Sequence, residues 1–97
     1  MQKVVSSVHV DKDHVRVTEW RFAPDAATGW HRHGYDYVIT PVLGGQIEII
    51  GADGERTPFT MEPGVSYFRE AGVEHDVVNG EDGELIFVEV ELKHRPG

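Results

Sequence analysis

The chain has 97 residues and a formal net charge of −8, with 27% charged and 39% hydrophobic residues. This length predicts one domain, residues 1–97, with its core over about residues 15–92. Nucleic acids and anionic membranes are excluded as partners, because both bind clustered Lys and Arg, and the nine basic residues here are scattered. The chain has no cysteine, no segment resembling a signal peptide and no apolar run of membrane-spanning length, so we expect a cytoplasmic protein.

Turn-forming residues divide the chain into short runs rich in Val, Ile, Tyr, Phe and Thr, which is the pattern of β-strands. No window keeps apolar residues at helical spacing over the length of a helix. In chain order, we expect strands at Val15 to Phe22, Tyr35 to Leu43, Gln46 to Ile50, Val65 to Arg69 and Leu85 to Leu92. Residues 1–12 and 93–97 are expected to be tails or edge strands, and Pro41 predicts a sheet edge or a bulge. The series predicts an all-β fold, either an antiparallel sandwich or a barrel.

Three of the six histidines could meet at one point. Side chains alternate along a strand, so His31 and His33 point the same way, and His75 shares a face with Val77 and Asn79. Three imidazoles at one point suit a transition metal. A His-x-His pair by itself also fits hydrogen-bonded core histidines. The other three stand in polar contexts near the chain ends and are expected at the surface: His9, His14 and His94.

The two histidine segments resemble the paired motifs of the cupin superfamily. The first cupin motif reads G-x5-H-x-H-x3,4-E-x6-G, and its two histidines and closing glycine are matched by His31, His33 and Gly44. The second reads G-x5-P-x-G-x2-H-x3-N and is matched by Gly64, Gly72, His75 and Asn79. The resemblance spans about residues 15–92 and implies a single-domain double-stranded β-helix, the jelly-roll barrel. Residues 28–37 are similar, more loosely, to small cupins associated with β-alanine degradation.

Three positions depart from the cupin motifs. Asp25 replaces the opening glycine of the first motif, and Glu70 replaces the proline of the second. Tyr37 stands where most cupins place a glutamate ligand. The resemblance therefore implies one divalent metal, Zn, Fe, Ni or Cu, held by His31 and His33 with His75 and without a carboxylate. A free phenol has a pKa near 10, so Tyr37 is expected to line the pocket and donate or relay a proton rather than bind the metal.

The resemblance implies an enzyme that acts on a small organic molecule, either a metal-dependent oxygenase such as a dioxygenase or an isomerase or hydrolase. The alternative is a non-catalytic ligand-binding or sensory module that works with another chain, and a third reading is a metal-free barrel in which the histidines merely pack. Arg69 is expected either to bind a substrate carboxylate in the cavity or to form a surface ion pair. Asn79 is expected to fix a turn or to orient His75.

Several strands have more apolar surface than one core can cover. The run Tyr37 to Leu43 is apolar on both faces. In Leu85 to Leu92 one face carries Ile86, Val88, Val90 and Leu92, and the other carries Glu89 and Glu91. A symmetric partner would cover a second apolar face and protect edge strands. We therefore expect a homodimer.

Overall fold

The computed structural model describes residues 3–93, and within this range the chain forms strands and turns without a helix. Five strands form one antiparallel sheet, in the order β1 (Val5–Asp11), β2 (Val15–Phe22), β9 (Leu85–Leu92), β4 (Asp36–Leu43) and β7 (Tyr67–Arg69). Four strands form the other, in the order β3 (His31–Arg32), β8 (Glu74–Asn79), β5 (Gly45–Ile50) and β6 (Arg56–Met61). The predicted all-β architecture is confirmed, and no helix in the described part of the chain has the length and hydropathy to cross a membrane.

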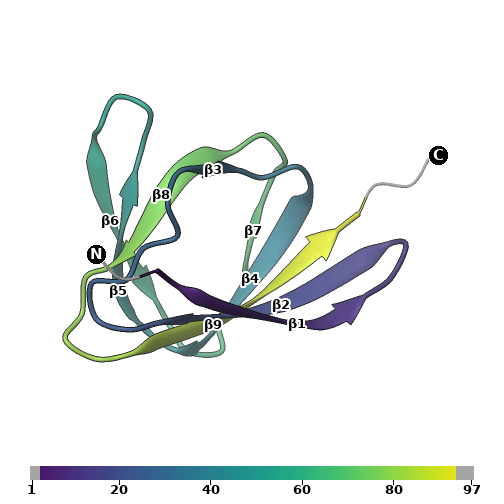
Figure 1. Cartoon of the computed structure of the whole chain (residues 1–97), viewed down its shortest axis with the longest axis horizontal. Coiled ribbons are helices and arrows are strands. Elements are labelled where there is room, and N and C mark those ends of the chain that lie inside the picture. Colours follow the sequence, from purple (N-terminus) through teal and green to yellow (C-terminus); the bar gives the residue numbers. More distant parts are fainter. Residues whose placement is uncertain (1–2, 94–97) are drawn as a thin grey trace.

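The two sheets enclose the core between them. In Figure 1, β1, β2 and β9 run along the lower side, while β8 and β3 lie across from them. Strands β2 and β9 pair over their whole length, which seats Phe22 opposite Leu85 and Trp20 opposite Phe87. Phe22 and Leu85 are completely buried, and the Phe22 and Phe87 rings lie 5.5 Å apart between centroids. Ile47 contributes from the facing sheet. Removing this apolar area from water supplies the main driving force for the fold.

The predicted strands agree closely with the observed ones. Strands β2 and β9 have the predicted bounds, β4 begins one residue later than predicted and β5 one residue earlier. Strand β7 covers only Tyr67–Arg69, and Val65, which was predicted to begin it, is 60% exposed. Within the predicted N-terminal tail or edge strand, β1 is an edge strand. Residues 1–2 and 94–97 of the predicted tails lie outside the described residues.

Two motif positions show why their residues are needed. A Cβ added at Gly44 would lie 2.2 Å from the carbonyl oxygen of Met61, so only glycine fits beside β6. Asp25, which replaces the motif's first glycine, adopts a φ of 65°, a left-handed conformation that Asp tolerates better than most residues. The departure at Asp25 therefore keeps the turn.

Pro41 lies in the interior strand β4 next to a register shift, which confirms the predicted bulge.

Candidate metal centre

Three imidazoles from two distant segments converge at one point. His31 opens β3 and stands directly opposite His75 of β8 in the strand register. His33 follows β3, outside the strands. The Nε2 atom of His33 lies 3.0 Å from Nε2 of His31 and 3.1 Å from Nε2 of His75. The structure thus brings together all three histidines that the sequence predicted as ligands, whereas His9 and His14 are exposed and His94 lies outside the described residues.

The chain changes sheets at this point. His31 belongs to the four-stranded sheet, whereas Asp36 begins β4 in the five-stranded sheet, so the segment between them bends from one sheet to the other. The bend is anchored by two backbone hydrogen bonds, in which His33 N–H donates to the Val73 carbonyl at 2.9 Å and Gly72 N–H donates to the His33 carbonyl at 2.8 Å. Gly72 has a φ of 99°, which favours glycine and explains this motif position. The second motif therefore fixes the backbone of the first.

The Nδ1 atom of His31 points away from the cluster toward the preceding loop. It lies 2.9 Å from the Gly29 carbonyl oxygen and 3.2 Å from Thr28 Oγ1. Because a carbonyl can only accept a hydrogen bond, its proximity favours the tautomer that carries the proton on Nδ1. Thr28 Oγ1 is held in turn by Asp76 at 3.3 Å and by the Val77 N–H at 3.1 Å. The Nε2 lone pair of His31 is thereby left free to face the other two rings.

A buried carboxylate lies behind the second imidazole. Glu89, on β9, is only 5% exposed, and its Oε2 lies 3.4 Å from Nδ1 of His33. Its Oε1 accepts a hydrogen bond of 3.0 Å from the indole N–H of Trp20. Carboxylates in this position behind a ligating histidine set its tautomer and increase its basicity. Glu89 was not predicted as a site residue.

The composition of β9 suggests that the face with Ile86 and Val88 is buried, but the structure buries the face that carries Glu89. The predicted alternation is correct, but the face that carries Leu85, Phe87 and Glu89 points inward, while Ile86 and Val88 are only half-buried on the outer face. The signal for Glu89 was therefore present in the sequence, as a carboxylate in alternation with two large apolar residues. Nothing in the sequence showed which of the two faces lies inside.

Burial keeps two of the three imidazoles, those of His33 and His75, uncharged at neutral pH. Burial, assisted by the charge of His31, lowers the pKa of His33 to about 4. Burial and the two neighbouring imidazoles likewise lower the pKa of His75 to about 4. Three imidazole lone pairs at about 3 Å repel one another unless a proton or a cation lies between them. Three converging Nε2 atoms, with Nδ1 of His31 and Nδ1 of His33 beside acceptors, therefore fit a bound divalent metal.

Tyr37 takes part in the cluster through its ring. It is 2% exposed and stacks on the His33 ring, with 3.9 Å between centroids and 18° between planes. Burial, with a smaller effect from Glu89, raises the pKa of Tyr37 to about 12, so its hydroxyl stays protonated. Neighbouring Asp36 turns away and accepts the Ala71 N–H at 2.8 Å, as its position in the strand predicted. The missing carboxylate of the first motif is therefore not replaced by Asp36.

The two remaining residues that the sequence singled out, Asn79 and Arg69, lie in different surroundings. Asn79 is fully buried and donates to the carbonyls of Phe22, Ala23 and Gly83 while accepting the Glu81 N–H, so it fixes a turn as predicted. Arg69 and Tyr37 line a cavity of about 710 Å³ that also contains the three imidazoles. This volume lies within the usual range for small-molecule sites. Arg69 was expected either in the cavity or in a surface ion pair, and the structure places it in the cavity.

The chain is similar to known proteins over nearly its whole length. The family model of the cupin domain matches residues 18–91. The β-alanine degradation protein BauB of Pseudomonas aeruginosa is 48% identical over 91 residues, covering 94% of this chain and 95% of that protein. The crystal structure of a cupin domain from Bordetella pertussis shares 43% identity and a TM-score of 0.92, over 96% of both chains. The predicted jelly-roll fold and the resemblance to small cupins are confirmed.

A more distant solved structure shares the fold alone. The polyketide cyclase RemF from Streptomyces resistomycificus is 23% identical with a TM-score of 0.73, over 98% of this chain and 68% of that one. The same barrel therefore also occurs in a protein with an enzyme's name, but the low identity carries no residue role across.

Replacing Glu89 with Gln should weaken metal binding by roughly 10- to 100-fold, the usual cost of losing such a carboxylate. The Gln amide oxygen would keep the Trp20 N–H, so its NH2 group would face Nδ1 of His33 and favour the tautomer with the proton on Nε2. Competition titration with Zn²⁺ and a chromophoric chelator measures the change. The exposed Glu55→Gln variant is the matched control, and equal affinities in the two variants would contradict the role of Glu89.

The same variant should also change the pH dependence of folding in metal-free protein. Burial raises the pKa of Glu89 from 4.5 to about 7, so its contribution to stability is present below pH 4.5 and is lost as the pH rises through 7. Glu89→Gln does not titrate, so its free energy of unfolding relative to the native chain should rise by about 2–3 kcal/mol between about pH 5 and pH 8. Urea unfolding at both values tests this expectation. A difference that stays constant with pH would show that Glu89 titrates normally.

Proposed function

This chain belongs to the cupin family, and on that premise we propose that it is a metal-dependent enzyme acting on a small organic molecule, with His31, His33 and His75 as ligands of one divalent metal. The observation that carries the proposal is the convergence of three Nε2 atoms at the wall of a cavity large enough for such a molecule. Buried polar groups that are held in this way occur preferentially at functional sites.

Each residue of the cluster has a part in this proposal. A bound Zn, Fe, Ni or Cu ion would supply Lewis acidity to a substrate in the cavity. His31 and His33 are oriented by Gly29 and Glu89, which keeps their Nε2 atoms aimed at the shared point. Tyr37 lies against His33 with a protonated hydroxyl, so we assign it the donation or relay of a proton. The reaction is an oxygenation, an isomerisation or a hydrolysis.

The relatives support a metabolic role without defining the reaction. BauB is named for β-alanine degradation, which is the breakdown of a small organic acid, and it is 48% identical to this chain. The proposed site is consistent with a small-molecule pathway of that kind. The alternative, a non-catalytic ligand-binding or sensory module acting with another chain, uses the same cavity and differs only in whether turnover occurs. That the chain acts as one domain in the cytoplasm remains a prediction.

Replacing His75 with Ala should abolish stoichiometric metal binding, because two remaining imidazoles leave the site without its third ligand. Elemental analysis of protein purified from its native host, followed by titration with Fe²⁺, Zn²⁺, Ni²⁺ and Cu²⁺, measures the effect. His14→Ala is the matched control, since His14 is exposed and is not one of the three clustered histidines. Equal metal content in both variants would show that the wrong histidines were chosen.

Turnover separates the enzyme from the binding module. Metal-loaded native protein is incubated with small organic acids, and product formation and oxygen uptake are followed, with the His75→Ala variant as the blank. Metal-dependent product formation supports the enzyme and oxygen uptake identifies the oxygenase. Tight ligand binding that produces no product in any metal form supports the non-catalytic module.

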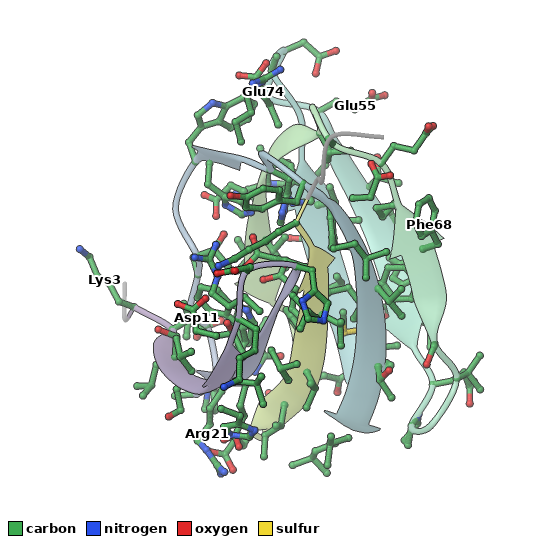
Figure 2. All side chains as sticks on the ribbon, turned by 90° about the vertical axis from the view of Figure 1, so that its right-hand side faces the viewer. Lys3, Asp11, Arg21, Glu55, Phe68 and Glu74 are labelled. Carbon is green, nitrogen blue, oxygen red and sulfur yellow. The ribbon has the colours of Figure 1, made fainter. Side chains whose placement is uncertain are left out.

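We also propose that the chain is a homodimer through the outer face of the five-stranded sheet. The strand registers align one row of apolar residues across all five strands, in the order Val10, Val17, Val90, Val38 and Phe68. Phe68 is 49% exposed, and Figure 2 shows it on the outside of the molecule. An apolar row that crosses a whole sheet is unusual on the surface of a monomer. A two-fold-related copy of the same face would cover it.

Phe68→Lys should convert the dimer to a monomer, because a charge at the end of the row would have to be buried in the interface. Sedimentation equilibrium measures the mass against the chain mass of 10.9 kDa. Trp30→Lys is the control, since Trp30 is 51% exposed but precedes β3 in the other sheet. A native protein that sediments as a monomer would contradict the proposed interface.

A further inference from the structure

Much of the cavity wall beside the imidazoles is apolar. The wall includes Ile39, Ile47, Ile49, Met61, Val77 and Phe87. Such a wall favours the hydrocarbon part of any ligand but does not distinguish one polar head group from another. The polar side chains that remain unpaired in the cavity therefore decide which head group is accepted.

Arg69 is one such side chain, and the structure holds it in place. It ends strand β7, where Tyr67 and Arg69 line the cavity while Phe68 between them is 49% exposed. The guanidinium carbon lies 4.5 Å from the Tyr67 ring centroid and 5.7 Å from that of Phe59, two cation–π contacts. One of its N–H groups donates to the Phe68 carbonyl at 2.9 Å. The guanidinium is thus fixed on aromatic faces, with further donors left over.

The carboxylates of the cavity are already used by other partners. Glu91 forms a two-pronged pair with Arg16, at 2.6 and 3.0 Å, and Glu89 accepts the Trp20 N–H beside His33. Within residues 3–93, no ion pair joins Arg69 to an acidic side chain. A half-buried guanidinium that lacks an anionic partner in a chain of net charge −8 is a specific feature.

Arg69 also lies close enough to the imidazoles for a single ligand to reach both. It stands opposite Tyr37 in the register of β4 and β7, and the Tyr37 ring stacks on His33. Burial is the largest effect on both neighbouring groups, since it lowers the pKa of His75 and raises the pKa of Tyr37. The charge of Arg69 acts on both as well and lowers the pKa of each. Arg69 and the three imidazoles therefore line one cavity, in which a single ligand can contact both.

We propose that Arg69 is the carboxylate-binding group of this cavity, and that the substrates are short aliphatic monocarboxylic acids rather than amines or uncharged molecules. The planar guanidinium matches the two oxygens of a carboxylate, and the apolar wall accommodates the carbon chain. The inference rests on the proposed function, because it assigns the substrate class of the same cavity. It also runs against the net charge, which alone would favour a cationic ligand.

The test compares three probes of one length: hexanoate, hexanamide and hexylamine. Each is titrated into the full chain by isothermal calorimetry after chelation of metals, so that a carboxylate bound to a metal cannot imitate Arg69. Native protein should bind hexanoate about tenfold or more tightly than hexanamide, as expected for charge-assisted hydrogen bonds. Hexylamine should bind most weakly. A preference for hexylamine, or equal affinity for the acid and the amide, overturns the proposal without any variant being needed.

Two substitutions locate the effect. Arg69→Gln should remove the preference for hexanoate over hexanamide, and Arg69→Lys should retain a smaller preference, because it keeps the charge but loses the planar fork. Arg56→Gln is the matched control, since Arg56 is an exposed arginine that pairs with Glu48 and lies outside the residues that line the cavity. It removes the same charge and should keep the preference. An equal loss in the Arg56 and Arg69 variants would assign the effect to net charge and overturn a specific role for Arg69.

Zinc affinity is measured on the same variants. Arg69→Gln should bind Zn²⁺ at least as tightly as native protein, because it removes a positive charge near His75, and this binding also shows that the variant is folded. If the preference for hexanoate is absent while His75 is required for zinc binding, the Arg69 proposal fails and the metal site stands. If the preference depends on Arg69 while zinc binding does not depend on His75, the carboxylate site stands and the metal proposal fails.

Discussion

The register between β3 and β8 is the constraint on which the candidate site depends. It places His31 directly opposite His75, although the two residues are far apart in the chain. Neighbouring residues in an antiparallel pair are close enough for their side chains to touch, so one backbone pairing brings two imidazoles together without any further device. The third comes from the bend after β3, which is tied by Gly72 and Val73 to the turn before β8. A slip of one residue would turn the ring of His75 out of the cavity.

The site places costly groups in the interior of a small protein. Burial lowers the pKa of His33 and His75 and raises the pKa of Glu89. The shifts arise because moving a charged group out of water during folding costs free energy. Glu89 is tolerated because the Trp20 N–H satisfies one oxygen and His33 faces the other. All buried polar side-chain atoms in the described residues have a hydrogen-bond partner. The buried polar network is therefore fully hydrogen-bonded, as a network that belongs to the folded structure should be, and is not a packing defect.

The five-stranded sheet has an unusual distribution of polarity. Its inner face carries Glu89, Arg16 and Arg69 among the core residues, while its outer face carries the apolar row from Val10 to Phe68. In a small antiparallel sheet the usual arrangement is apolar inside and polar outside. Here the inner polar groups surround a cavity, and the outer apolar groups are available to a second copy. Both departures from the usual pattern are explained if the sheet serves a site on one face and an interface on the other.

Much of the molecule could be read from local patterns. Short β-branched and aromatic runs between turns were sufficient for the all-β fold and for the bounds of β2 and β9, because strand formation depends on residues close in the chain. The three histidines were identified because their spacing matches two motifs whose glycines and asparagine have local backbone roles. The glutamate missing from the first motif was visible in the same way. The role of Glu89 was not, because its contact with His33 joins two strands from opposite parts of the chain.

The sequence by itself determined the fold class, the alternation of side chains along each strand and the identity of the candidate ligands, since all of these depend on residue type and spacing. Only the tertiary structure decided which face of β9 lies inside, and therefore that a carboxylate stands behind His33 and that Arg69 faces the cavity instead of solvent. The physical reason is that alternation is a property of one strand, whereas inside and outside are set by the sheet that packs against it.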